Sequence, residues 1–162
     1  MRASADIEEA IDTYGDTVWR VCFLYFKQSN EAQDAFQETV IKYASFDGLF
    51  NDSEHKKAWL IRVATNVCKD MLKASHRFNL SIDDDATSFA IPSADCDAQP
   101  GSVKSEIVEA ILALTDPPRT PVYLSLYEGY TAPEIADMLE APVNTVYSWI
   151  SRGKQQLKEA LA

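Results

Sequence analysis

The sequence predicts an all-helical protein, in which a flexible acidic linker joins two small helical domains. Apolar residues recur at steps of three and four in both halves of the 162-residue chain, and no run alternates as a half-buried strand does. Residues 79–102 between the halves are rich in Asp, Ser, Ala and Pro and have no helical period. We therefore expect a three-helix bundle at residues 1–78, the linker at residues 79–104 and a helix-turn-helix domain at residues 105–162.

Three helices are expected in the first domain. The second follows Asn30, which has the residue type of an N-cap, with Gln33 at the capping-box position. The third begins near Ser53 and runs to about Phe78. The apolar stripes are Ile7, Ile11, Tyr14, Val18, Cys22 and Tyr25 in the first helix, Ala32, Phe36, Val40 and Tyr43 in the second, and Leu60, Val63, Ala64, Val67, Met71 and Ala74 in the third.

The second domain opens with a short amphipathic stripe of Ile107, Ile111 and Leu114. Thr120 followed by Pro121 is typical of an N-cap and a first helical residue, and Gly129 marks the end of that helix. The last helix should begin near Val143 or Asn144.

Composition excludes several classes of function. The 25 acidic residues outnumber the 15 basic ones, and no apolar run is long enough to span a membrane. Three cysteines without a close pair and only two histidines predict neither a metal site nor a cofactor. No glycine-rich phosphate loop or nucleophile motif appears, so we expect no enzyme. The N-terminal residues lack an apolar leader, and together these features favour the cytoplasm.

One basic segment interrupts this acidic chain. Residues 54–77 hold six basic residues against two acidic ones. At 100° per residue, one narrow face of the third helix carries Arg62, Asn66, Lys69, Lys73 and Arg77. Trp59 lies at its edge, where an indole either stacks an unpaired base or packs as a core aromatic. The stripe suits a nucleic-acid backbone, and the alternative is an ordinary solvated face.

Residues 131–152 give the sharpest local signal, that of a helix-turn-helix. Thr131 and Glu134 form a capping box, the small Ala136 lets two helices cross closely, and Val146 fills the space between them. The second helix would place its exposed residues in a major groove, with a plain helical hairpin as the alternative. The groove-facing residues would be Asn144, Thr145, Tyr147, Ser148, Arg152 and Lys154.

Three blocks occur in a diagnostic order: DAFQETVIKY at 34–43, KAWLIRVATNVCKD at 57–70, and the helix-turn-helix block that ends in NTVYSWISR at 144–152. In this order, split by an acidic segment, they resemble the sigma-70 family of bacterial transcription initiation factors. The short length resembles the extracytoplasmic-function group, which keeps only regions 2 and 4. The resemblance covers nearly all of the chain outside the linker.

The resemblance implies a subunit that binds core RNA polymerase and directs it to promoter DNA, commonly under the control of an anti-sigma factor. Region 2 would contact the polymerase through Asp34, Phe36, Gln37 and Glu38. The stretch that handles the −10 element would contain Lys56, Lys57, Trp59, Arg62, Asn66, Lys69 and Lys73, and the basic stripe extends to Arg77. Region 4 would place its recognition helix at the −35 element.

Two departures from the family pattern stand out. Glu140 occupies the turn position where the family usually has glycine, and a left-handed backbone there costs roughly 1–2 kcal/mol. Tyr147 and Trp149 replace residues that are often basic in the family. Two other functions remain open: a conventional DNA-binding regulator, and a degenerate sigma-like module that occupies polymerase without starting transcription.

Overall fold

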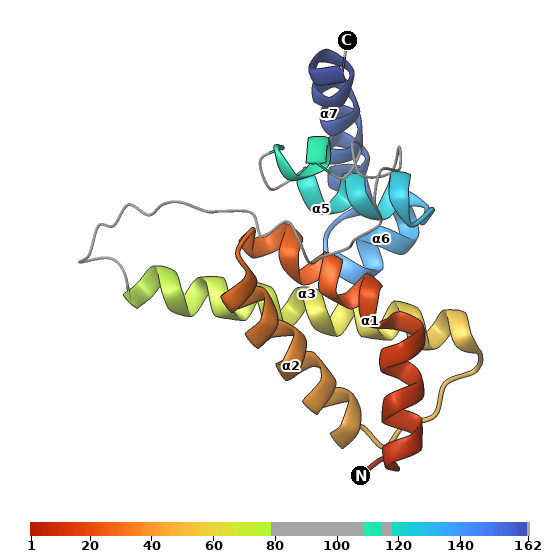
Figure 1. Ribbon diagram of the computed structural model, residues 1–162. Helices are drawn as coiled ribbons and strands as arrows, with labels where there is room; N and C mark the ends of the chain where they lie inside the picture. Colours follow the sequence, from red (N-terminus) through yellow and green to blue (C-terminus); the bar gives the residue numbers. More distant parts are fainter. Residues whose placement is uncertain (79–108, 115–117, 162) are drawn as a thin grey trace. The chain divides into compact units, whose positions relative to one another are not determined.

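The computed structural model describes residues 1–78, 109–114 and 118–161, with the side chains of residues 75–78 also left undescribed (Figure 1). All regular structure in these ranges is helical, which confirms the predicted class. The chain divides into two compact units, residues 1–91 and 92–162. The predicted acidic linker lies outside the described residues.

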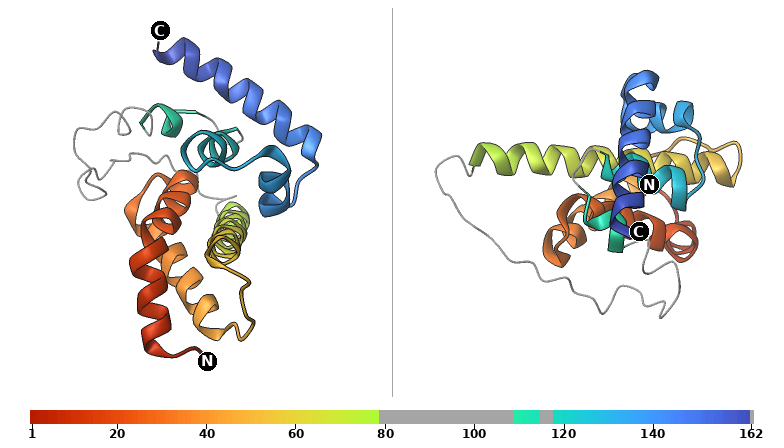
Figure 2. Two further views of the ribbon diagram at one scale, coloured as in Figure 1. Left: turned by 90° about the vertical axis from the view of Figure 1, so that its right-hand side faces the viewer. Right: turned by 90° about the horizontal axis from the view of Figure 1, so that it is seen from above.

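The first unit is a bundle of α1 (Ser4–Phe26), α2 (Ser29–Ser45) and α3 (Ser53–Phe78). Each helix contacts the other two, and the left view of Figure 2 looks nearly along α3, with α1 and α2 together on one side of it. The core consists mainly of small and branched side chains, and both Cys22 and Cys68 are buried. Fully enclosed members include Val21, Leu24, Ala32, Ala35, Tyr43, Ile61 and Ala64.

Three details of the first unit were predicted wrongly. Asn30 is not the N-cap of α2, because Lys27 is left-handed and Gln28 extended, and the chain re-enters a helix at Ser29. Ile11 is 38% exposed, although it lies on the same side of α1 as Val18 and Cys22, which are buried. Ala74 is exposed because the C-terminal end of α3 projects beyond α1 and α2 (Figure 1).

The second unit contains helical residues 109–112 and then α5 (Arg119–Val122), the π-helical turn η1 (Tyr123–Tyr127), α6 (Ala132–Leu139) and α7 (Val143–Leu161). Gly129 follows with a positive φ of 85°, as a helix stop requires. Thr120 is not an N-cap: the helix starts one residue earlier, and the Arg119 side chain donates to the Leu114 carbonyl at 2.8 Å. That contact holds the start of α5 in the core.

The helix-turn-helix forms as the sequence predicts. The Glu134 backbone N–H donates to the Thr131 hydroxyl at 3.3 Å, and the Thr131 N–H donates to the Glu134 carboxylate at 2.8 Å. Glu140 ends α6 with φ 56° and ψ 50°, which is left-handed. Val146 is fully buried. The turn therefore adopts the left-handed conformation that glycine enters at the lowest cost.

A glycine that sequence analysis did not single out sets the distance between α7 and α5. Gly153 is buried in α7, and a Cβ atom at that position would lie 2.0 Å from Cγ2 of Val122 and 3.3 Å from Pro118. Val122 is itself fully buried and β-branched, so it has little room to turn away. At this point α5 and α7 come so close together that only glycine fits at position 153.

Candidate nucleic-acid interfaces

One face of α3 carries four of the eight predicted −10 residues. Arg62 and Lys73 are exposed, whereas Asn66 and Lys69 are half-buried. The opposite side of the helix buries Leu60, Ile61, Ala64, Val67 and Cys68 against the bundle. The helical period therefore places the four polar side chains on the side directed away from α1 and α2. The side chain of Arg77 lies outside the described residues.

Lys56 lies away from this face. Its Nζ is 3.6 Å from a carboxylate oxygen of Asp6 and 5.7 Å from the centre of the Tyr43 ring, and its side chain is only 21% exposed. Burial by itself would lower the pKa of Lys56, but the interactions with Tyr43, Asp6 and Glu9 outweigh it and raise the pKa. Lys56 is thus tied to α1 and α2, and Lys57 beside it is half-buried.

Trp59 belongs to an aromatic cluster formed by Tyr43, Phe46, Phe50 and Trp59. Its ring centroid lies 4.7 Å from that of Phe46, 5.6 Å from Phe50 and 6.0 Å from Tyr43. The indole is half-buried. Of the two interpretations of Trp59, packing between α3 and the loop that precedes it is the one that these contacts favour.

A polar network that sequence analysis missed lies against this cluster. The Arg2 guanidinium lies 4.4 Å from the Tyr43 ring centre and donates to Asp6 at 2.9 Å, and the Tyr43 hydroxyl donates to the same carboxylate at 2.8 Å. These two donors lower the pKa of Asp6, that from Tyr43 most strongly. Burial, and then the bond to Asp6, raises the pKa of Tyr43. No local sequence signal connects residues this far apart.

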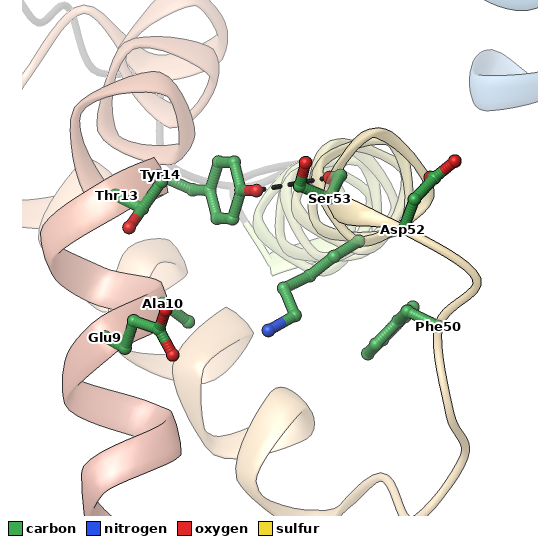
Figure 3. Close-up of a pocket in the computed structure, with 8 residues that line it drawn as sticks. Glu9, Ala10, Thr13, Tyr14, Phe50, Asp52 and Ser53 are labelled. Atoms are coloured by element: carbon green, nitrogen blue, oxygen red, sulfur yellow. Dashed lines mark hydrogen bonds between the residues drawn. The ribbon is translucent and has the colours of Figure 1, made fainter.

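A groove of about 420 Å³ lies between α1 and the start of α3 (Figure 3). Tyr14 reaches across it from α1, and its hydroxyl donates to the Ser53 carbonyl at 3.2 Å. Asp52 accepts a hydrogen bond from the His55 backbone N–H at 2.8 Å and so caps α3. Among the described residues, no three His, Cys, Asp or Glu side chains gather closely enough to hold a metal ion.

The predicted polymerase-contact residues on α2 divide between two faces. Asp34, Gln37 and Glu38 are exposed. Phe36 instead packs edge-on against Trp19, with 6.3 Å between ring centroids. Ile41 is 57% exposed and follows Gln37 by four residues, so it lies on the exposed face. The sequence does contain a signal that could have identified Ile41, because it is an apolar residue that falls outside the predicted buried stripe of this helix.

Helix α7 carries the predicted −35 residues, and most of them are exposed. Val146, Ile150, Gly153 and Leu157 are buried on one side. Thr145 is half-buried, and the exposed members are Asn144, Tyr147, Ser148, Arg152 and Lys154. Lys158 is exposed one turn after Lys154 and adds a cation that sequence analysis did not include.

Comparison with known proteins places both units. Residues 10–92 match the family model described as Sigma-70 region 2, and residues 104–157 match the one described as Sigma-70, region 4. The ECF RNA polymerase sigma factor SigW of Bacillus subtilis is 30% identical over 170 aligned residues, which cover 98% of this chain and 89% of that protein. RNA polymerase sigma-H factor of Pseudomonas aeruginosa is 29% identical over 85% of this chain and 76% of its own length.

Two solved structures have a similar fold. The sigma factor RpoE of Bartonella quintana, in complex with the anti-sigma factor NepR, superposes with a TM-score of 0.75 at 22% identity, over 96% of each chain. CnrH, in complex with the cytosolic domain of CnrY, gives a TM-score of 0.60 at 17% identity, over 98% of this chain and 89% of that one. Within the described residues, no helix combines the length and the apolar character that a membrane span needs.

Proposed function

Because the chain belongs to the sigma-70 family, in its extracytoplasmic-function group, we propose that its two units recognise the two elements of one promoter class. Its function is that of a promoter-specificity subunit that directs transcription initiation by RNA polymerase. The first unit would act at the −10 element through α3, and the second at the −35 element through α7. Chemistry belongs to the polymerase, so we assign the chain no reaction of its own.

The observation that carries this proposal is that each unit exposes a helix face of the kind that binds DNA. In the first unit, Arg62, Lys69 and Lys73 follow one side of α3 in an otherwise acidic chain. Lysine and arginine neutralise backbone phosphates, which supply most of the sequence-independent affinity. In the second unit, Asn144 and Arg152 can reach base edges while Ser148 and Lys154 contact phosphates.

We further propose that α2 contacts core polymerase through Asp34, Gln37 and Glu38. Ile41 would supply an apolar anchor beside these polar groups, because an exposed branched side chain gains most from burial at an interface. The inward position of Phe36 suits a supporting role under this face. Tethering to polymerase raises the effective DNA concentration for two weak sites, which suits a chain with a net charge of −10.

We also propose that an anti-sigma factor controls the chain in the cytoplasm, where the polymerase acts. Support comes from the solved RpoE–NepR complex, whose sigma chain shares this fold. Recovery of the tagged chain from its native host should yield one stable small partner besides polymerase. Finding only polymerase subunits under all growth conditions would contradict this part of the proposal.

Run-off transcription tests the function directly. Purified chain is mixed with core polymerase and fragmented host DNA, and transcript starts are mapped. Discrete starts that share −10 and −35 motifs would support the proposal and identify the promoter. Core binding without starts would indicate a module that only occupies polymerase. DNA binding without core binding would indicate a conventional regulator.

The basic face of α3 has its own test. Replacing Arg62, Lys69 and Lys73 with Ala should abolish promoter opening while core binding is retained. Loss of three phosphate contacts should also reduce the slope of log affinity for single-stranded DNA against log salt by about 2. Lys27→Gln, in the turn between α1 and α2, is the control and should leave opening intact. Normal opening by the triple variant would remove this face from the mechanism.

A further inference from the structure

Arg2 connects three parts of the first unit that are distant in sequence. Its Nε donates to the Tyr43 carbonyl at 3.1 Å, one terminal nitrogen donates to the Gly48 carbonyl at 2.7 Å, and the other donates to Asp6. The Arg2 backbone N–H donates to the Ala44 carbonyl at 2.9 Å. The side chain is only 12% exposed. We refer to Arg2 with these acceptors as the Arg2 latch.

The latch holds the loop 46–52, which joins α2 to α3. Besides the bond to Gly48, the guanidinium carbon lies 5.2 Å from the ring centre of Phe50 and 5.9 Å from that of Phe46. A Cβ on Gly48 would lie 2.4 Å from the Phe46 ring, so that ring packs directly against the loop backbone. An irregular loop must find partners for its backbone groups outside a helix, and Arg2 supplies one here.

The same loop sets the start of α3. Phe46 and Phe50 pack on Trp59, and Asp52 caps the helix by accepting from the His55 N–H. From Leu60 to Cys68, α3 is held by the buried contacts with α1 and α2. The Arg2 latch therefore acts on the loop and on the first two turns of α3, upstream of the exposed basic residues.

We propose that Arg2 is a positioning residue for −10 recognition. It fixes the loop 46–52 and the first turns of α3 in the geometry that the −10 strand requires, without contacting DNA. This inference rests on the function proposed for α3. The planar guanidinium is essential, because one arginine donates to three acceptors in fixed directions, whereas a lysine ammonium is a point charge on a flexible stem. Support of this kind determines whether a binding face is ordered before its ligand arrives.

The test compares Arg2→Ala, Arg2→Lys and the control Asp47→Asn in the full chain, assembled with core polymerase on a promoter mapped by run-off. Asp47 lies in the same loop, and its carboxylate is 81% exposed and lies 3.3 Å from the chain's N-terminal ammonium. Three quantities are measured: core affinity, permanganate reactivity of unpaired promoter thymines, and Trp59 fluorescence in a background with Trp19 and Trp149 replaced by Phe.

Arg2→Ala should reduce the melted promoter fraction by about tenfold or more, because each hydrogen bond to a charged group shifts a local equilibrium by roughly that factor. Core affinity should stay within about twofold, as for a substitution distant from the contact face. Trp59 emission should shift to the red. Arg2→Lys should fail like Arg2→Ala, and Asp47→Asn should keep the wild-type Trp59 emission. If Arg2→Ala does not fold, Arg2→Lys provides the same comparison with the charge retained.

Several results would overturn the inference. One is normal melting by Arg2→Ala with a red-shifted Trp59. Another is a parallel fall in melting and core affinity, which indicates general loss of structure, and a third is full rescue by Arg2→Lys. The triple variant of α3 separates this inference from the proposed function. If the triple variant fails and Arg2→Ala melts DNA, only the role of Arg2 is wrong; if both melt DNA, the −10 assignment of α3 is wrong and the inference falls with it.

Discussion

The two helical units are held together over different sequence distances. In the first unit, the hydrogen bonds from Arg2 to the Tyr43 and Gly48 carbonyls and from Tyr43 to Asp6 join residues 37 to 46 positions apart. In the second, the capping box spans three residues, and the bonds from Arg119 to Leu114 and from Tyr123 to Glu128 span five. A long-range contact must offset more loop-closure entropy than a local one. The first unit therefore depends on tertiary assembly, and the second on local signals plus one tight helix crossing.

The crossing of α5 and α7 is where we expect the largest effect of a single substitution. Gly153→Ala places a Cβ 2.0 Å from Val122, so α7 must move. Overpacking of this kind costs about 1–3 kcal/mol, occasionally more. Denaturant unfolding followed by Trp149, with Trp19 and Trp59 replaced by Phe, reports on the second unit alone.

Gly15→Ala is the matched control in the first unit. A Cβ there meets Ile11 at 3.4 Å and Phe36 at 3.9 Å, which are ordinary contacts, and Gly15 lies in the middle of α1. Gly15→Ala should stabilise the first unit by roughly 0.5–1 kcal/mol, because glycine is a poor helix former. Equal midpoints for Gly153→Ala and wild type would mean that the helices do not cross as tightly as described.

The next effect concerns the polar network of the first unit. Tyr43→Phe removes the hydroxyl that donates to Asp6 at 2.8 Å and should cost about 1 kcal/mol at neutral pH. The pKa of Asp6 in the folded chain is below its ordinary value of 3.8. The ionised Asp6 carboxylate therefore contributes to folding stability above about pH 4, and this contribution is lost as the pH falls through the lower folded pKa. The difference between Tyr43→Phe and wild type should therefore shrink below pH 4.

Unfolding followed by Trp19 at pH 7 and pH 3 measures this difference, with Trp59 and Trp149 replaced by Phe. A second background, which keeps Trp149 and has Trp19 and Trp59 replaced by Phe, reports on the second unit and is the control: its unfolding should not respond to Tyr43→Phe. A difference that stays constant with pH would show that the hydroxyl acts through packing and not through the Asp6 carboxylate.

This contrast explains which features the sequence could predict. The capping box at Thr131, the left-handed Glu140 and the start of α3 depend on residues within one or two turns, and the expected patterns appear in the structure. Arg2 and Gly153 were missed because their partners lie in other elements. No periodicity identifies such partners.

The candidate interfaces show the same limit. Helical period was enough to place Arg62, Asn66, Lys69 and Lys73 on one face of α3. The resemblance to the sigma-70 family, and not the helical period, grouped Lys56 with these four residues and Phe36 with the polar residues of α2. Tertiary contacts with Asp6 and Trp19 separate both residues from those faces. Their DNA and polymerase roles stay predictions until the variants are assayed.

The smallest predicted effect tests how local strain is tolerated in the second unit. Glu140→Gly should stabilise it by about 1 kcal/mol or less, because relief of the left-handed penalty is partly offset by the greater freedom of glycine in the unfolded chain. Glu140→Ala is the control, since it removes the carboxylate but keeps the Cβ that causes the strain. The difference in unfolding free energy between the two variants, followed by Trp149 fluorescence, isolates the cost of the left-handed backbone. Lys27→Gly offers the same test in the first unit, where φ is 59°. Similar gains at both turns would show that this cost is purely local, whereas a gain only at Glu140 would mean that tertiary contacts hold Lys27 in its conformation.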